Sequence, residues 1–133
     1  MALSNYERVG KALDLLRQRL ALFVDREIHA AIKADSVRTD AIRRFADDPM
    51  LSAKSITDWD ASGLLKLMWE TWNDVFKKTL GYSERSLVSE IHDFRNKWAH
   101  QEPFTSDDAD RALDSMARLL TAVSATAADV IQK

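Results

Sequence analysis

Apolar residues recur at steps of three and four along most of the chain, which is the period of an α-helix with one buried face. The first stripe predicts a helix from Ser4 to Ile32, opened by a capping box between Ser4 and Glu7. Gly10 interrupts this helix, and a glycine in such a position predicts that a neighbouring backbone passes close by. The stripe comprises Tyr6, Val9, Leu13, Leu16, Leu20, Phe23, Val24, Ile28 and Ala31.

The segment 33–59 is the least regular part of the chain. Val37–Phe45 predicts a short helix that ends before Pro49, because the residue preceding a proline avoids helical backbone angles. The residues that follow predict a loop in which Trp59 is the one anchored aromatic side chain.

A third helix is predicted to begin at Asp60 or Ser62 and to end at Leu80, with Gly81 as its C-terminal cap. Its apolar residues cover more than half of its circumference, which is typical of a central helix or of one that also covers a partner. These residues are Leu64, Leu65, Leu67, Met68, Trp69, Trp72, Val75 and Phe76.

Two further helices complete the pattern. One begins at Ser83 and ends before Pro103, and the other follows an N-cap at Thr105 or Ser106, with an acidic first turn that complements the helix dipole. Because the connections are short, we expect antiparallel neighbours and an all-α bundle of four to five helices. The stripes comprise Leu87, Val88, Ile91, Phe94 and Trp98, and then Ala109, Ala112, Leu113, Met116, Leu119, Leu120, Val123, Ala127, Val130 and Ile131, after the acidic turn of Asp107, Asp108 and Asp110.

The composition agrees with a helical class. Three glycines and two prolines in 133 residues are too few for most sandwiches, barrels and doubly wound sheets, and the length suits one domain over residues 1–133. The lack of cysteine excludes a disulfide framework, a thiolate zinc site and a cysteine nucleophile. No apolar run approaches the ~20 residues of a membrane span, and no signal-peptide core is present, so we expect a soluble, cytoplasmic protein without membrane contact.

Charge is unevenly distributed along the chain, although the net charge is only −2. Residues 1–76 carry −1, residues 77–101 carry +2, and residues 102–133 carry −3. The net value excludes a globally basic nucleic-acid binder but permits a local basic patch. The one positive segment contains the candidate site, although a solvated helix face explains the small excess equally well.

Arg95 and His100 stand out near the end of the fourth predicted helix. An arginine is a planar, permanent cation suited to phosphate oxygens, and a histidine exchanges a proton near neutral pH. Together they can cleave RNA without a metal, with the imidazole moving a proton and the guanidinium stabilising the phosphate. On a straight helix the two side chains lie about 140° apart with about 7.5 Å of rise, so either the helix distorts near Ala99 or two copies combine their groups in a homodimer.

The spacing also permits a purely structural interpretation. His100 would then lie in the last helical turn and bond a free carbonyl, while Arg95 would be a surface cation. Glu90 and Asp93, which precede the pair on the same helix, either orient Arg95 or form ordinary surface ion pairs.

The residues around this pair resemble a known family. FRNKWAHQEPF, followed by DDADRALDSMARLLTAV, is similar to the HEPN domain family (higher eukaryote and prokaryote nucleotide-binding), in the subgroup shared with a eukaryotic endoribonuclease of nuclear messenger-RNA surveillance. The resemblance extends upstream through NYERVGKALDLLRQRLALFV, LLKLMWETWNDVF and LGYSERSLVSEIHDFRN, so it covers nearly the whole chain.

The resemblance implies a helical bundle that is usually a homodimer, with an Arg-x4-His motif at the interface and metal-independent endoribonuclease chemistry. Carried over, Arg95 and His100 match the catalytic pair, and Asn96 matches a polar residue that orients the site. Lys97, with Glu90 and Asp93, completes the candidates for binding or orienting an RNA substrate. In prokaryotes such domains often begin larger proteins with ATPase modules that are linked to phage defence, and this chain is similar to one such domain on its own.

Other features favour structural roles. His29 and His92 lack the i, i+4 spacing of a helical metal pair, and the acidic turn of the last helix suits the helix dipole, so no metal site and no cofactor are predicted. Trp69, Trp72 and Trp98 have the helical spacing of core or interface residues, although tryptophans can also stack on bases. Trp98, between the two motif residues, is the candidate for a dimer interface.

Three hypotheses follow from these observations. The first is a dimeric ribonuclease domain in which His100 is the acid/base and Arg95 stabilises the phosphate. The second is a non-catalytic module that dimerises, or binds a nucleotide or a protein partner, within a larger ATPase-containing protein. The third is a toxin that an antitoxin silences.

Overall fold

The computed structural model describes residues 4–33 and 55–132, including their side chains except those of Ile32 and of residues 125–132. Within these ranges the chain forms four α-helices and two short 3-10 helices, and no strand. The prediction of an all-α bundle is confirmed, while the helix predicted at Val37–Phe45 lies outside the described residues. The elements are α1 (Asn5–Lys33), η1 (Ile56–Asp58), α4 (Ala61–Glu70), η2 (Phe76–Lys78), α5 (Tyr82–Ala99) and α6 (Ser106–Gln132).

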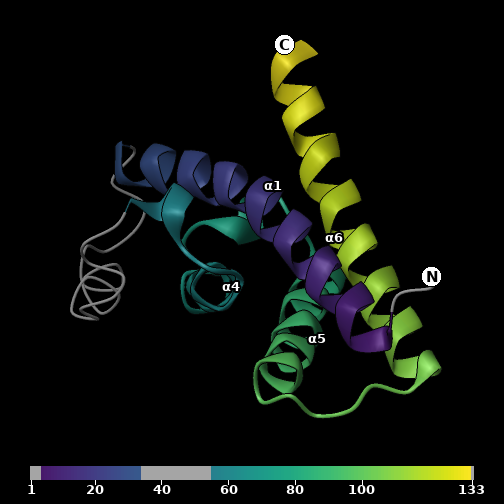
Figure 1. The fold of residues 1–133 in the computed structure, drawn as a ribbon. Helices are drawn as coiled ribbons and strands as arrows, with labels where there is room; N and C mark the ends of the chain where they lie inside the picture. Colours follow the sequence, from purple (N-terminus) through teal and green to yellow (C-terminus); the bar gives the residue numbers. More distant parts are fainter. Residues whose placement is uncertain (1–3, 34–54, 133) are drawn as a thin grey trace.

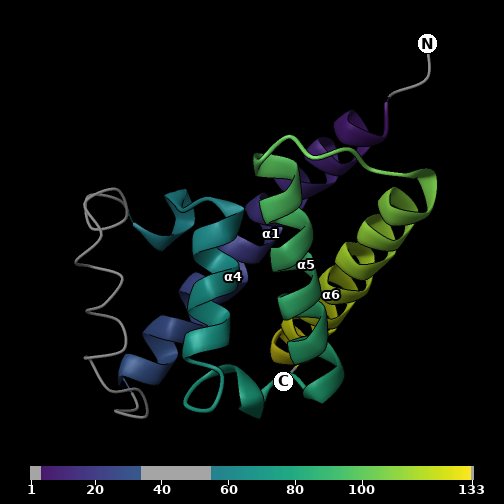
Figure 2. The same ribbon diagram turned by 90° about the horizontal axis from the view of Figure 1, so that it is seen from below.

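The helices form two layers. α4, α5 and α6 lie side by side as antiparallel neighbours, and α1 packs across one face of this layer (Figure 1), behind the three helices in the view of Figure 2. α5 therefore packs against α4 on one side and against α6 on the other, and its face opposite α1 is turned to solvent. Within the described ranges, no helix combines the length and the apolar character that crossing a membrane requires.

The helix α1 follows its predicted apolar stripe closely. The N–H of Glu7 donates to Oγ of Ser4 at 3.1 Å, and the N–H of Ser4 lies 3.5 Å from Oε1 of Glu7, so the capping box is confirmed. All residues of the stripe from Val9 to Ala31 are buried, whereas Tyr6 at the N-terminal end is 37% exposed. The burial of this stripe against the three-helix layer forms the centre of the core.

The sequence pattern predicts that a neighbouring backbone lies close to Gly10. The close neighbour is instead the side chain of Trp98. A Cβ at position 10 would lie only 2.9 Å from the indole Nε1 of Trp98. Trp98 also stacks on Tyr6, with 5.4 Å between the ring centroids and an angle of 13° between the rings. The glycine therefore makes room for the aromatic contact that joins α1 to the C-terminal part of α5.

The prediction that the third helix continues to Leu80 is wrong, because α4 ends at Glu70. Thr71 caps it, and the buried Thr71 hydroxyl donates to a backbone carbonyl one turn earlier at 2.6 Å. Asn73 and Asp74 follow in a turn, as expected of side chains that compete with helical backbone hydrogen bonds. The turn still directs the remaining apolar side chains into the core: Trp72 is 3% exposed, Val75 4% and Phe76 0%.

Gly81 has a different role from the one predicted. It is the N-cap of α5 rather than the C-cap of a preceding helix, and its φ of −105° requires no left-handed backbone. Its N–H donates to Oε2 of Glu84 at 3.1 Å. The start of α6 is confirmed by Thr105, whose hydroxyl accepts from the N–H of Asp108 at 3.0 Å.

Candidate functional site

The C-terminus of α5 is closed by its own backbone in a Schellman motif. Gln101 adopts a left-handed φ of 58°, and its N–H donates to the carbonyl of Trp98 at 3.0 Å. The N–H of Glu102 donates to the carbonyl of Lys97 at 3.1 Å. The N–H of His100 closes the preceding turn at 3.0 Å. Backbone donors therefore satisfy the carbonyls that a histidine side chain would otherwise cap.

His100 is the C-cap residue of α5, and its side chain is exposed. In the described part of the chain, its imidazole forms neither a hydrogen bond nor an ion pair, so the carbonyl contact expected from the structural interpretation is not made. The ring is accessible to a ligand that approaches from outside the bundle.

Arg95 points toward the N-terminus of α4. Its Nη2 lies 3.5 Å from Oδ2 of Asp60, and its Nη1 lies 3.5 Å from the amide oxygen of Asn96. Asp60 is also the N-cap of α4, since its Oδ1 accepts from the N–H of Gly63 at 2.8 Å. The side chains of Arg95 and Asp60 are 27% and 61% exposed, so the ion pair is a weak surface contact that an incoming anion can displace.

Arg95 and His100 do not converge within one chain. α5 remains helical through Ala99, so the distortion that would bring the two side chains together is absent from this helix. Arg95 contacts α4, whereas His100 continues the outward face of α5, seven residues after Asp93. The helix distortion near Ala99, one of the two arrangements that the spacing predicts, is therefore not observed.

Two of the predicted substrate-binding residues connect α5 to α6 instead. Nζ of Lys97 lies 3.2 Å from Oδ2 of Asp108, and hydrogen bonds from Lys97 and Thr105 lower the pKa of Asp108. Glu90 forms an ion pair with Arg111. Both residues are thus engaged in contacts between neighbouring helices.

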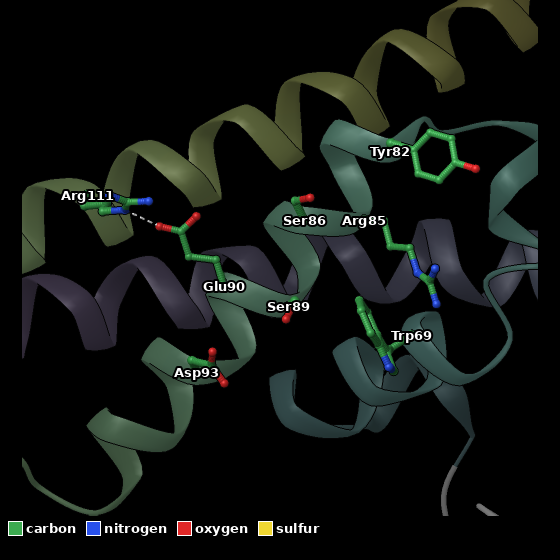
Figure 3. A pocket seen from close by; sticks show the side chains of 8 residues that line it. All are labelled: Trp69, Tyr82, Arg85, Ser86, Ser89, Glu90, Asp93 and Arg111. Carbon is green, nitrogen blue, oxygen red and sulfur yellow. Dashed lines mark hydrogen bonds and ion pairs between the residues drawn. The ribbon is translucent and has the colours of Figure 1, made fainter.

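Asp93, by contrast, lies in an open groove of about 560 Å³ on the outward face of α5 (Figure 3). Trp69 of α4 stands at one side of the groove, and Arg111 of α6 stands at the other. The sequence pattern did not predict this groove, although the polar residues of α5 recur at helical spacing along it. From α5 it is lined by Tyr82, Arg85, Ser86, Ser89, Glu90 and Asp93.

The tryptophans of the third and fourth predicted helices have different surroundings. Trp72 is buried and Trp69 is 42% exposed. Trp98 faces α1, where it stacks on Tyr6 and lies close to Gly10, and its role at a dimer interface stays a prediction. Its Nε1 is buried, and within the described residues it has no hydrogen-bond partner.

The remaining two histidines lie on α5 and α1. Burial lowers the pKa of His92, which lies 3.4 Å from Oγ of Ser62; repulsion from Arg95 adds to this effect, while Asp93 opposes it. His29 is exposed on α1, where its Nδ1 donates to the carbonyl of Asp25 at 2.8 Å. Over residues 4–33 and 55–132, no three His, Cys, Asp or Glu side chains are grouped so that they could hold a metal ion.

Comparison with known proteins agrees with this architecture. A family model described as Swt1-like HEPN matches residues 11–124, which include α4, α5 and the Arg95–His100 pair. No curated protein and no solved structure matches the chain. The family match covers well over half of the chain, and the observed fold is the helical bundle that the resemblance implies. The chain therefore belongs to the Swt1-like HEPN family.

Proposed function

We propose that this chain is a metal-independent endoribonuclease domain in which two copies combine Arg95 and His100 in one cleft. The observation that carries the proposal is the exposed imidazole of His100, which the backbone closure of α5 leaves without a structural hydrogen bond in the described part of the chain. Membership of the HEPN family supports the ribonuclease class. The intact Arg-x4-His motif supports the assignment of the pair.

The reaction needs only proton transfer and charge stabilisation. One imidazole of His100 takes the proton of a ribose 2′-hydroxyl, and the 2′-oxygen forms a bond to the adjacent phosphorus. The bond from phosphorus to the 5′-oxygen of the next nucleotide breaks, and the leaving oxygen takes a proton from water while the imidazolium returns its proton to the solvent. The products are a 2′,3′-cyclic phosphate and a 5′-hydroxyl end.

Arg95 stabilises the charge that builds on the phosphate during this step. The ion pair between Arg95 and Asp60 is exposed and weak. A phosphate that accepts two hydrogen bonds from the Arg95 guanidinium can therefore replace the carboxylate of Asp60. Because Arg95 and His100 lie on different sides of α5, a phosphate that touches both groups must lie between two copies. The proposal therefore requires a homodimer.

We place this activity in the cytoplasm, in RNA surveillance or in prokaryotic defence against phage, as part of a larger protein with an ATPase or another partner module. If expression of the chain is toxic to the host cell and His100→Ala relieves this toxicity, the ribonuclease acts as a toxin. The support for this setting is the resemblance of the motif region to HEPN domains of that kind.

The direct test is cleavage of a labelled single-stranded RNA in the presence of a chelator. His100→Ala is expected to lower the rate by about 10²-fold to 10⁴-fold, because proton transfer in the transition state is lost. Arg95→Ala is expected to be similarly damaging. His29→Ala and Arg118→Ala, which change exposed residues elsewhere, are the matched controls. Undiminished cleavage by folded His100→Ala protein would overturn the proposal.

A mixing experiment tests whether the site is shared. Arg95→Ala and His100→Ala chains are each inactive alone, but a mixed dimer contains one site with both groups intact. If the two variants exchange subunits freely, about a quarter of the wild-type activity returns, since half of the dimers are mixed and each restores one site of two. No recovery, with mixed dimers demonstrated by differently tagged chains, would contradict the composite cleft.

One observation favours the alternative of a non-catalytic interaction module. Arg95 contacts Asp60 and Asn96, so it has partners that give it a structural role without any substrate. Light scattering after size-exclusion chromatography separates the two functions when it is combined with the cleavage assay. A dimer that does not cleave RNA and that persists after Arg95→Ala would establish the module.

A further inference from the structure

Two large aromatic side chains are exposed at the groove on the outward face of α5. Tyr82 is 81% exposed and Trp69 is 42% exposed, and both line the groove from different helices (Figure 3). Neither ring contributes its full area to the core, so the fold does not explain their presence at the surface. Exposed rings beside a groove are suited to stacking on flat ligands, above all on unpaired bases.

Arg85 lies against one of these rings. Its guanidinium carbon is 4.3 Å from the centre of the Trp69 ring, a cation–π contact. Its Nε is buried, and in the described part of the chain Arg85 has no hydrogen bond and no carboxylate partner. The positive charge is thus positioned by an aromatic face rather than neutralised by an acid. Its outer nitrogens are available to the oxygens of a phosphate.

The rest of the groove supplies polar groups of both kinds. Ser86 and Ser89 carry hydroxyls that can donate and accept, and Asp93 carries carboxylate oxygens that accept from base amino groups. The charge of Glu90 is balanced by Arg111 across the groove. Rings for stacking, a free cation and acceptors for base edges are together the recognition groups of single-stranded RNA.

The groove is also longer than one nucleotide, and its axis leads to His100. Tyr82 and Asp93 are eleven residues apart on α5, a rise of about 16 Å, whereas stacked nucleotides advance by about 3.4 Å each. His100 follows Asp93 by seven residues, or two turns, on the same face of the helix. A single-stranded RNA that lies in the groove therefore runs toward the exposed imidazole of His100.

We infer that this groove binds the bases of single-stranded RNA next to the scissile phosphate, with Trp69 and Tyr82 as stacking rings and Arg85 as a phosphate contact. This inference rests on the proposed ribonuclease function and names its substrate class. It assigns to the Trp69–Arg85 pair a task that neither packing nor catalysis by Arg95 and His100 requires.

The test is binding of a fluorescent 2′-O-methyl oligonucleotide, which is not cleaved because it has no free 2′-hydroxyl, to the 133-residue chain. Trp69→Ala, Tyr82→Ala and Arg85→Ala are each expected to weaken binding about fivefold or more in fluorescence anisotropy. Trp69→Phe keeps a ring beside Arg85 and is expected to retain most of the affinity. Wild-type affinity in all three alanine variants would overturn the inference.

Matched controls come from α1. Arg19 is exposed and, among the described residues, also lacks a carboxylate partner, but no aromatic ring lies against it. Arg19→Ala therefore removes the same charge without touching the groove. Leu22 is 68% exposed, so Leu22→Ala removes a comparable exposed apolar side chain. Both variants are expected to bind the oligonucleotide within about twofold of wild type.

Further measurements separate failure of this inference from failure of the proposed function. For cleavable RNA, the groove variants are expected to raise KM with little change in kcat, whereas His100→Ala binds normally but does not cleave. Normal KM in active groove variants would overturn the groove alone. A wild-type chain that binds through the groove without cleaving RNA would support the groove and contradict the ribonuclease proposal.

Two competing occupants have their own signatures. If AMP binds and the oligonucleotide binds no more tightly than AMP, the groove binds a free nucleotide, and the inference that it binds single-stranded RNA is wrong. If Trp69→Ala or Tyr82→Ala turns a dimer into a monomer in light scattering, the groove is an interface between copies, and the inference is overturned.

Discussion

The two faces of α5 meet different demands. Toward α1, the helix presents Val88 and Ile91, which are fully buried, and Trp98, which stacks on a neighbouring ring. On the outward face it presents Tyr82 and His100, which the core does not use. Because the buried face makes the core contacts and the outward face carries side chains that we propose to meet RNA, substitutions of those outward residues should leave the stability of the fold unchanged.

The largest expected effect is the difference in unfolding free energy between Ile91→Ala and His100→Ala. Ile91→Ala leaves a cavity between helices and is expected to lower the free energy of unfolding by about 2–5 kcal/mol. His100→Ala is expected to change it by less than about 0.5 kcal/mol, because the side chain is exposed and makes no contact that stabilises the described fold. Urea denaturation measures both. A large loss of stability in His100→Ala would break the division between the faces.

The next effect concerns the contact of α5 with α1. Gly10→Ala places a methyl 2.9 Å from Nε1 of Trp98, so we expect a loss of about 1–3 kcal/mol in unfolding free energy. Trp98→Phe in the same chain removes the close atom and is expected to recover part of this loss. A double-mutant cycle by chemical denaturation measures the coupling, and strict additivity of the two changes would refute the contact as its cause.

These inner contacts also show what the sequence allows one to predict. The stripe of α1, its capping box and the start of α6 follow from local signals, namely helical periodicity and capping residues. The end of α4 and the role of Gly81 were not predicted, because the apolar run continues past Thr71 although Asn73 and Asp74 favour a turn. Periodicity likewise places Gly10 at a close approach but does not reveal that Trp98 is the neighbour.

The candidate site depends on different signals. Arg95 and His100 were proposed from residue chemistry and family resemblance, and their assignment stays a prediction. The groove was not identified, because exposed aromatics such as Trp69 have the same spacing as buried ones. The closure of α5 was also not predictable, since Gln101 carries no left-handed signature of the kind that glycine or asparagine provides.

A smaller effect is expected at the start of α4, where the two functions of Asp60 can be separated. Asp60→Ala removes the cap on Gly63 and is expected to destabilise the protein by about 0.5–2 kcal/mol. Arg95→Ala alone is expected to cost less than about 1 kcal/mol, as is typical of exposed ion pairs. Asp114→Ala, which breaks an exposed pair within α6, is the control. Thermal denaturation of the three variants tests this order.

His92 is expected to make the stability of the fold depend on pH. Burial lowers its pKa below 6.5, so the folded state binds fewer protons than the unfolded state in this range. The contribution of the neutral ring is fully present above pH 6.5 and is lost as the pH falls from there through the lower folded value. His92→Gln should therefore show a smaller drop in Tm between about pH 7.5 and 5.5 than the wild type. His29→Gln is the exposed control, and equal drops in both variants would contradict the prediction.

The smallest effect is expected at Gln101, whose φ of 58° is unfavourable for a residue with a side chain. Gln101→Gly relieves this conformation and is expected to raise the unfolding free energy by up to about 1 kcal/mol. Gln101→Val should lower it. Cleavage by Gln101→Gly should remain at the wild-type level if the neighbouring imidazole acts from solvent, and a large loss would show that the Gln101 side chain takes part.

The backbone closure of α5 has an evolutionary consequence. Since Gln101 and Glu102 satisfy the carbonyls of Trp98 and Lys97 through their main-chain N–H groups, this closure of α5 does not use the side chain at position 100. A single substitution there can remove the chemistry while the domain still folds, and the reverse substitution can restore it. Enzymes and silent binding domains built on this bundle can therefore be separated by one codon, with no intermediate that is selected against for misfolding.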